Sequence, residues 1–207
     1  MAVLLIRHGE TALNAARVMQ PPDTPLSGRG VEQAGRLAAR LAPMGVGRIL
    51  TSDLARAAMT AEPLATRSGA PLELEPLLRE RDFGALRGRP YAELDFDPFA
   101  PGYVPPGGES WEDFHARVER GWERVVARAR ETEGHLAVVT HGLVCHSVVE
   151  RLARLAPGLA RPTRGWRNSS VTILESEPPH TVSLIDCAVH LQEEPEAADR
   201  AAELGRA

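Results

Sequence analysis

Two runs of apolar residues are typical of buried strands, one at residues 2–6 and one at residues 136–140, the second ending in a threonine. Neither run alternates between apolar and polar positions, as is usual for a strand that is buried on both faces of a sheet. Further segments favour strands by their alternation or their content of branched side chains: residues 48–52, 71–75, 171–174 and 181–185.

Apolar residues at helical spacing predict helices between these strands. Ser27 and Ser110 are the predicted N-caps of two of them. A further helix is expected to start at Asp53, and Pro63 is expected to kink or end it. The apolar stripes comprise Val31, Ala34, Leu37, Ala38 and Leu41; Trp111, Phe114, Val118, Trp122, Val125, Val126 and Ala129; and Val144, Val148, Val149 and Leu152. Alternating strands and helices predict an α/β fold.

The composition changes after residue 84 to glycine, proline and aromatic residues. Eight of the nine aromatic residues of the chain lie between Phe83 and Trp122. We expect residues 85–109 to form an irregular lid over a site rather than a second domain. Residues 1–192 are therefore expected to form one domain, followed by a polar C-terminal tail at 193–207.

Charge and cysteine content narrow the class of protein. The formal net charge of −4 argues against a general nucleic-acid binder, and all 24 basic residues are arginine, which binds phosphate through a bidentate fork. Cys145 and Cys187 form no C-x-x-C pair, which suits a reducing compartment. The apolar run at the N-terminus is too short to span a membrane. We expect a soluble cytoplasmic protein without nucleic-acid or membrane partners.

Each of the two long apolar runs leads directly into a histidine followed by a glycine. Arg7 and His8 follow the first run, and His141-Gly142 follows the second. The carboxyl ends of parallel strands form the edge at which open α/β sheets bind their ligands. Either histidine alone could be an ordinary residue at a strand end. The pair predicts two imidazoles that converge on one site.

Two further features suit a phosphoryl group at that edge. Arg56 lies near the start of a predicted helix, whose free N–H groups favour an anion, and Glu80 precedes a glycine turn. Taken alone, Arg56 is more often a surface ion-pair partner, and Glu80 lies in a charged run typical of a solvated loop. Two histidines could also share a metal. No H-E-x-x-H, C-x-x-C, P-loop or dinucleotide-binding motif occurs, so neither a metal site nor a cofactor is predicted.

The segment Leu5-Ile6-Arg7-His8-Gly9-Glu10-Thr11, with Asn14 after it, resembles the signature of the histidine phosphatase superfamily, the phosphoglycerate mutase-like enzymes. Further blocks follow in the family's order: Leu26-Ser27-x-x-Gly30-x-x-Gln33-Ala34, Thr51-Ser52-Asp53-Leu54-x-Arg56-Ala57-x-x-Thr60-Ala61, Leu78-x-Glu80-x-x-x-Gly84, Gly108-Glu109-Ser110, Val139-Thr140-His141-Gly142 and Asn168-Ser169-Ser170-Val171. The resemblance implies a three-layer α/β/α sandwich with a mostly parallel central sheet.

The resemblance also implies roles for individual residues. His8 would accept the phosphoryl group as a phosphohistidine, and Glu80 would protonate the leaving oxygen and then activate water. His141 would complete the catalytic set. The expected substrate-binding residues are Arg7, Asn14, Arg56 and Gly142. Because arginines would supply the positive charge, the resemblance implies a metal-independent phosphomonoesterase without a cofactor.

The core residues are common to phosphatases and mutases, so the lid decides between them. Mutases of the family resemble one another in a longer insert, with basic residues for the substrate carboxylate and second phosphate. Here Arg87 and Arg89 near the start of the lid are followed by Asp95, Asp97 and aromatic residues. Phe83 stands where mutases typically have tyrosine. These features favour a phosphatase acting on a small phosphorylated substrate. The aromatic residues suggest either an apolar leaving group or a small core of the lid's own: Phe83, Tyr91, Phe96, Phe99 and Tyr103.

Other functions stay open at this stage. They are a cofactor-dependent phosphoglycerate mutase, an α-ribazole phosphatase of cobalamin synthesis, and a phosphate-binding regulatory protein without catalytic activity. A homodimer is also left open.

Overall fold

The computed structural model describes residues 1–163 and 165–192, and the predicted tail at 193–207 lies outside the described residues. The described part contains a seven-stranded sheet in the order β3-β2-β4-β1-β6-β7-β5. Its strands are β1 (Ala2–Arg7), β2 (Val46–Thr51), β3 (Leu72–Leu74), β4 (His135–Thr140), β5 (Arg154–Leu155), β6 (Val171–Glu175) and β7 (Thr181–Cys187). The sheet is mostly parallel, because β6 alone runs against its neighbours β1 and β7.

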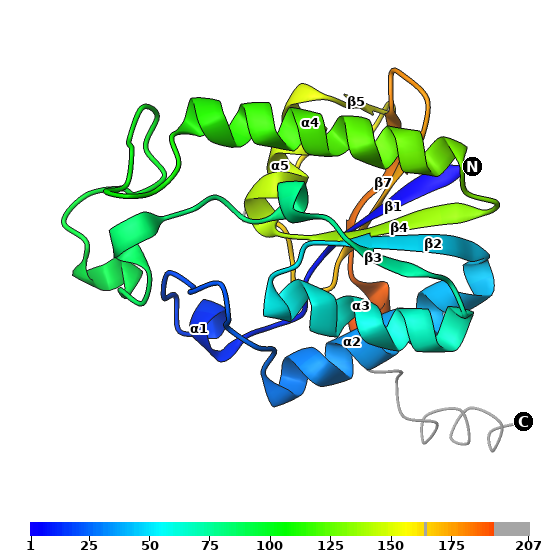
Figure 1. The fold of residues 1–207 in the computed structure, drawn as a ribbon, viewed down its shortest axis with the longest axis horizontal. Helices are drawn as coiled ribbons and strands as arrows, with labels where there is room; N and C mark the ends of the chain where they lie inside the picture. Colours follow the sequence, from blue (N-terminus) through cyan, green and yellow to red (C-terminus); the bar gives the residue numbers. More distant parts are fainter. Residues whose placement is uncertain (164, 193–207) are drawn as a thin grey trace, which may run out of the picture.

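Helices cover both faces of this sheet, with α4 and α5 on one side and α2 and α3 on the other (Figure 1). The helices are α1 (Ala12–Ala15), α2 (Gly28–Leu41), α3 (Ala55–Ser68), α4 (Trp111–Arg130) and α5 (Gly142–Arg151), with 3₁₀ turns at Ala42–Met44, Pro76–Leu78, Gly84–Leu86, Tyr91–Glu93 and Val189–Leu191. The structure is thus an α/β/α sandwich, as the resemblance to the histidine phosphatase superfamily implied.

The apolar run of β1 shows why the central strands carry no polar alternation. Val3 and Leu5 belong to the core cluster beneath α4 and α5, whereas Leu4 and Ile6 belong to the cluster beneath α2 and α3. All four side chains are buried. Burial on both faces therefore fixes the position of the strand and of the residues that follow it.

Most predicted elements are confirmed, and two details were wrong: the first residue of α3 and the burial of Val31. Of the two effects predicted for Pro63, a kink or the end of the helix, the second does not occur. Helix α3 begins at Ala55 rather than Asp53, and it continues through Pro63 to Ser68. Packing explains this continuity, because Ala57, Ala61 and Leu64 of α3 are buried in the cluster shared with α2, and this offsets the local cost of the proline. Val31, expected on the buried stripe of α2, is 51% exposed.

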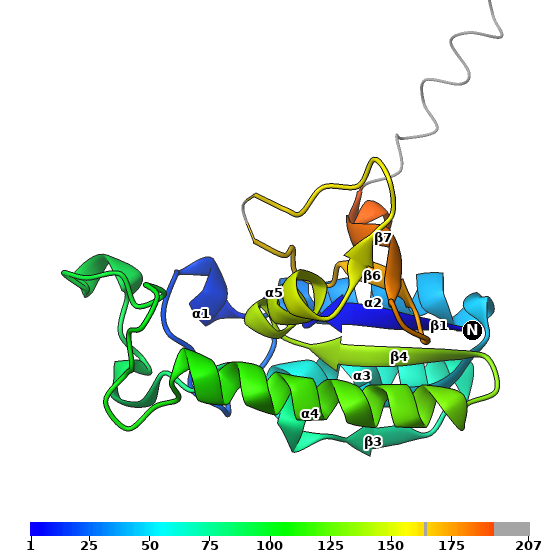
Figure 2. The same ribbon diagram turned by 90° about the horizontal axis from the view of Figure 1, so that it is seen from above.

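Residues 85–109, the predicted lid, form an irregular segment at the carboxyl ends of the strands, near α1 (Figures 1 and 2). Backbone hydrogen bonds tie it to the loop after α1, from Met19 N to Arg89 O (3.0 Å) and from Tyr91 N to Arg17 O (2.9 Å). The segment is therefore anchored beside the end of β1. Among the described residues, no helix has both the length and the apolar character to cross a bilayer.

The loop that follows β1 packs directly against the start of α2. A Cβ atom added to Gly30 would lie 2.0 Å from the carbonyl oxygen of Glu10, whereas one added to Gly35 of the same helix would meet nothing within 4 Å. Alanine normally stabilises a helix relative to glycine. At position 30 the backbone contact should reverse that preference.

We expect Gly30→Ala to lower the free energy of unfolding by about 2 kcal/mol, because the loop or the helix must shift. The matched control Gly35→Ala should raise it by about 1 kcal/mol. Urea denaturation of both variants tests this. Equal stabilisation by the two substitutions would mean that the contact between Gly30 and Glu10 is not tight.

Candidate active site

The two strand–His–Gly junctions meet at one edge of the sheet. Strands β1 and β4 are parallel neighbours with Arg7 opposite Thr140, and the backbone N–H of His8 donates to the carbonyl of Thr140 (2.9 Å). The ring centroids of His8 and His141 are 5.2 Å apart. The predicted convergence of the two imidazoles is therefore confirmed.

Hydrogen bonding orients the ring of His8. Its Nδ1 lies 2.7 Å from the carbonyl oxygen of Gly9, and because a carbonyl only accepts, Nδ1 carries the hydrogen. The lone pair then lies on Nε2. Burial, followed by the nearby charges of Arg7 and Arg56, lowers the pKa of His8 well below its usual value. The ring is thus held in its neutral, nucleophilic form.

His141 is the N-cap residue of α5 and is fully buried. Its Nε2 pairs with the hydroxyl of Ser52 at 2.9 Å. Burial is the main cause of a pKa well below the usual value, with the charge of Arg56 second. The motif at residues 51–61 contains Ser52 but does not mark it as a partner of His141. The proximity of the two strand ends, which only the fold provides, identifies it.

Two guanidinium groups flank the histidines. Arg7 at the end of β1 donates to the carbonyl of Trp166, and Arg56 in the first turn of α3 donates to the carbonyl of Pro21 (3.2 Å). Burial lowers the pKa of Arg56 to about 10, which still leaves it charged at neutral pH. Arg56 is 2% exposed, so it is not a surface ion-pair partner.

Among the described residues, three buried nitrogens of the predicted site residues lack a hydrogen-bond partner: Arg7 Nε, Arg56 Nε and His141 Nδ1. Leaving such groups unpaired costs free energy, so native structures rarely do so without a functional reason. An oxyanion with several acceptor oxygens is the type of ligand that such a set of nitrogens fits.

The carboxyl group of Glu80 lies at the N-terminus of α5. It accepts hydrogen bonds from the backbone N–H groups of Leu143 (3.2 Å) and Arg81 (3.0 Å). Burial raises its pKa, and these two bonds and the charges of Arg56 and Arg7 only partly offset the rise. Glu80 therefore keeps a proton to a higher pH than a solvated glutamate, as a general acid requires.

Arg117 of α4 holds the backbone around Glu80, a function that its place in the sequence does not reveal. Its guanidinium donates to the carbonyls of Leu77 and Arg79 (both 2.8 Å) and of Glu80 (3.3 Å). The same group pairs with both carboxylate oxygens of Glu109 at 2.8 and 2.7 Å. Glu109 belongs to the Gly108-Glu109-Ser110 block, but its partner on α4 could not be read from the sequence.

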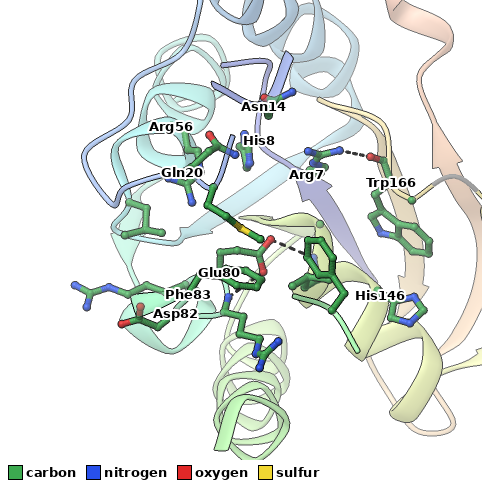
Figure 3. Close-up of a pocket in the computed structure, with 18 of the residues that line it drawn as sticks. Arg7, His8, Asn14, Gln20, Arg56, Glu80, Asp82, Phe83, His146 and Trp166 are labelled. Carbon is green, nitrogen blue, oxygen red and sulfur yellow. Dashed lines mark hydrogen bonds between the residues drawn. The ribbon is translucent and has the colours of Figure 1, made fainter. Parts of the chain in front are cut away.

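These residues border a cavity of about 940 Å³ (Figure 3). The sequence-predicted residues that line it are Arg7, His8, Asn14, Arg56, Glu80, Phe83, Tyr91, Phe99 and Gly142. His141 lies against the ring of His8 without lining the cavity. Asn14 donates to Asn168, whose amide in turn donates to the carbonyl of His8. Asn14 is thereby linked to the backbone of His8.

One expectation for the cavity wall was wrong. Phe96 and Tyr103 do not line the cavity but pack on each other, with ring centroids 4.9 Å apart. The sequence carried no signal for three further lining residues: Gln20, Trp166 and His146, which is exposed. In an irregular segment no periodicity tells which side chains face inward. Within the described ranges, no group of three or more His, Cys, Asp or Glu residues is arranged to hold a metal ion.

Comparison with known proteins agrees with this geometry. The family model described as "Histidine phosphatase superfamily (branch 1)" matches residues 3–184. A relative from Proteus mirabilis, named "Probable phosphoglycerate mutase GpmB", is 32% identical over 183 residues, covering 83% of each chain.

Two solved structures show the same similarity. A mycobacterial glucosyl-3-phosphoglycerate phosphatase has a TM-score of 0.72 at 30% identity, covering 84% of this chain and 90% of its own. The α-ribazole phosphatase from Shigella flexneri has a TM-score of 0.77 at 25% identity, covering 94% of this chain and 100% of its own.

The buried imidazoles predict how stability depends on pH. Because the pKa of His8 and of His141 is lowered by folding, the unfolded chain binds more protons below about pH 6.5. The free energy of unfolding should therefore fall as the pH drops from 7.5 to 5, by at most about 1.4 kcal/mol per pH unit for each ring. The raised pKa of Glu80 acts oppositely, since its stabilising contribution is lost as the pH rises through the folded-state value.

The variant His8→Gln removes one of the two rings and should flatten this acid-side dependence. Urea denaturation at a series of pH values measures it for both proteins. Parallel curves would show that His8 binds protons equally well in the folded and unfolded states.

Proposed function

Because the chain belongs to branch 1 of the histidine phosphatase superfamily, we propose that it is a metal-independent phosphatase that hydrolyses small phosphomonoesters through a phosphohistidine on His8. One observation carries the proposal. The neutral ring of His8, whose lone pair lies on Nε2, lines the cavity beside the guanidinium groups of Arg7 and Arg56 and the protonatable carboxyl group of Glu80. Residues 1–192 form the catalytic domain in this proposal, with residues 85–109 as its lid.

In the first step, Nε2 of His8 attacks the phosphorus atom, and the bond from phosphorus to the ester oxygen breaks. Glu80 gives its proton to that oxygen, so the alcohol leaves neutral. Arg7 and Arg56 stabilise the charge on the other phosphoryl oxygens, together with His141, Asn14 and the start of α5 at Gly142.

In the second step, water attacks the phosphohistidine. The Glu80 carboxylate, now deprotonated, takes a proton from the water as the phosphorus–nitrogen bond breaks. Inorganic phosphate leaves, and His8 and Glu80 return to their starting states. The two steps together add one water to the ester.

Phosphoglycerate mutase activity is the principal alternative, because relatives are named for it. A mutase must hold the sugar acid, return the phosphoryl group to it, and keep water from accepting that group instead. Two arginines of the lining that could bind the carboxylate of a sugar acid are already paired: Arg79 is bonded to Asp53, and Arg87 to Asp82. Their pairing favours hydrolysis over the mutase reaction. The α-ribazole and glucosyl-3-phosphoglycerate esters named for similar phosphatases belong in the substrate panel.

We expect His8→Ala to lower kcat for 4-nitrophenyl phosphate at least about a thousandfold, with wild-type turnover unchanged by a chelator. After brief mixing with labelled substrate, the wild type should keep label through an alkaline quench and lose it in acid, since phosphohistidine is acid-labile. The control His135→Ala, at the start of the strand that leads to His141, should keep its activity.

Other outcomes would identify the alternatives. Transfer of label to 3-phosphoglycerate rather than to water would indicate a mutase. Tight phosphate binding without turnover of any ester would indicate a regulatory protein.

Glu80→Gln should separate the two steps. A 4-nitrophenolate ion leaves without protonation, so the first step should continue, whereas the second step should slow about 100- to 10,000-fold because water lacks its base. The variant should therefore release one equivalent of nitrophenol in a burst and accumulate phosphoenzyme. With an alkyl phosphate no burst should occur. A burst-free loss of activity on both substrates would place the acid elsewhere.

A further inference from the structure

The cavity has a polar end and an aromatic wall. His8, Arg7 and Glu80 belong to the polar end, and the cavity opens from there toward residues of the 85–109 segment and its flanks. Figure 3 shows Phe83 on one side of the cavity and His146 and Trp166 on the other. A volume of about 940 Å³ far exceeds what one phosphoryl group needs, so the cavity has room for the leaving group beside this wall.

Rings that fix one another form this wall. Phe99 packs edge-to-face on Phe83, with centroids 5.5 Å apart, and on Tyr91, with centroids 5.7 Å apart. Met19 and Leu143, which also line the cavity, pack in the same cluster. The wall is thus held in place before a ligand binds, which reduces the entropy lost on binding.

The cations on the outer lining are already paired. Arg79 is bonded to Asp53, with Nε 2.6 Å from Oδ1, and Arg87 lies 2.6 Å from Asp82. These carboxylates already balance the positive charge of Arg79 and Arg87, so the attraction of either arginine for a second anionic group on the substrate is reduced.

Arg81, a further arginine of the lining, is 2% exposed and also has its partners within the protein. Its guanidinium carbon lies 4.0 Å from the ring centroid of Trp111, and its nitrogens donate to the carbonyls of Glu109 (3.1 Å), Pro98 (3.3 Å) and Tyr103 (2.6 Å). Within the described lining, Arg7 and Arg56 are therefore the guanidinium groups left for an anion, and both lie at the polar end.

We propose that this site selects phosphomonoesters whose leaving group is uncharged and presents an aromatic or apolar surface, and that Phe99 is a specificity-determining residue. The inference rests on the proposed function, because it assigns the phosphoryl group to the polar end. The inference adds the chemical class of the leaving group. A sugar acid, with a carboxylate at the outer end, is disfavoured.

Three primary alkyl phosphates test the proposal, because their alcohols differ little in reactivity as leaving groups. We expect kcat/KM to be highest for 2-phenylethyl phosphate, lower for glycerol 3-phosphate and lowest for 3-phosphoglycerate. Phe99→Ala should lower kcat/KM for the phenylethyl ester about tenfold and for glycerol 3-phosphate less than about twofold. A preference for 3-phosphoglycerate, or an equal loss on all three esters, would overturn the proposal.

Phe96→Ala is the matched control, since it removes the same ring from the same segment but outside the cavity. It should leave the order and the ratios unchanged. If Phe96→Ala lowers kcat/KM for the phenylethyl ester, relative to that for glycerol 3-phosphate, as much as Phe99→Ala does, the effect comes from disorder of the 85–109 segment.

A binding experiment distinguishes a failure of this inference from a failure of the proposed function. Calorimetry with phenylphosphonate and with 3-phosphonopropionate needs no turnover, and the aryl ligand should bind at least about tenfold more tightly. If no ester is hydrolysed but this preference is found, the proposed function fails and the binding inference stands. If esters are hydrolysed but the carboxylated ligand binds as tightly, the inference alone fails.

Discussion

The parallel pairing of β1 with β4 is the constraint on which the site depends. Each strand is buried on both faces, so the packing of two helical layers fixes its position and its register. The hydrogen bond from His8 to Thr140 continues that pairing one residue beyond the end of β1. The two imidazoles therefore lie side by side as a consequence of core packing, and a shift of either strand would separate them.

Burying two guanidinium groups, two imidazoles and a carboxyl group at one point is costly unless each charge is compensated. Backbone groups supply much of the compensation here, through the carbonyls of Trp166 and Pro21 for the arginines and the N–H groups of Leu143 and Arg81 for Glu80. Burial then lowers the pKa of His8 and raises that of Glu80. Burial thus shifts both groups toward their neutral forms, which are the forms that the proposed reaction requires of its nucleophile and its acid.

The sandwich supplies the reactive groups, whereas residues inserted outside its regular elements shape the rest of the cavity. Arg81 joins the two parts, because it follows Glu80 in the chain and its side chain holds the carbonyls of Pro98 and Tyr103. The acid and the wall are therefore positioned by adjacent residues. Such a division lets one fold keep its chemistry while loops change the substrate, which is common among widely used folds.

The sequence by itself determined the elements whose residues repeat with a regular period, and the residues that stand at their ends. Its uninterrupted apolar runs predicted the central strands, and the histidines directly after them could be placed at one edge of the sheet from their positions along the chain. Ser27 and Ser110 likewise marked the helix starts, and each accepts a hydrogen bond from a backbone N–H in the first turn. These features depend on local spacing, so they can be read along the chain.

The tertiary structure alone decided which distant groups meet. Nothing local links Arg117 to the backbone around residue 80, or Ser52 to His141, because those contacts span about 40 and 90 residues. Packing also carried α3 through Pro63, against its local propensity. In the irregular 85–109 segment, Phe99 faces the cavity while Phe96 does not, and no repeat in the sequence distinguishes them. Their directions follow from the contacts that the folded chain makes around them, and such contacts exist only once the fold has formed.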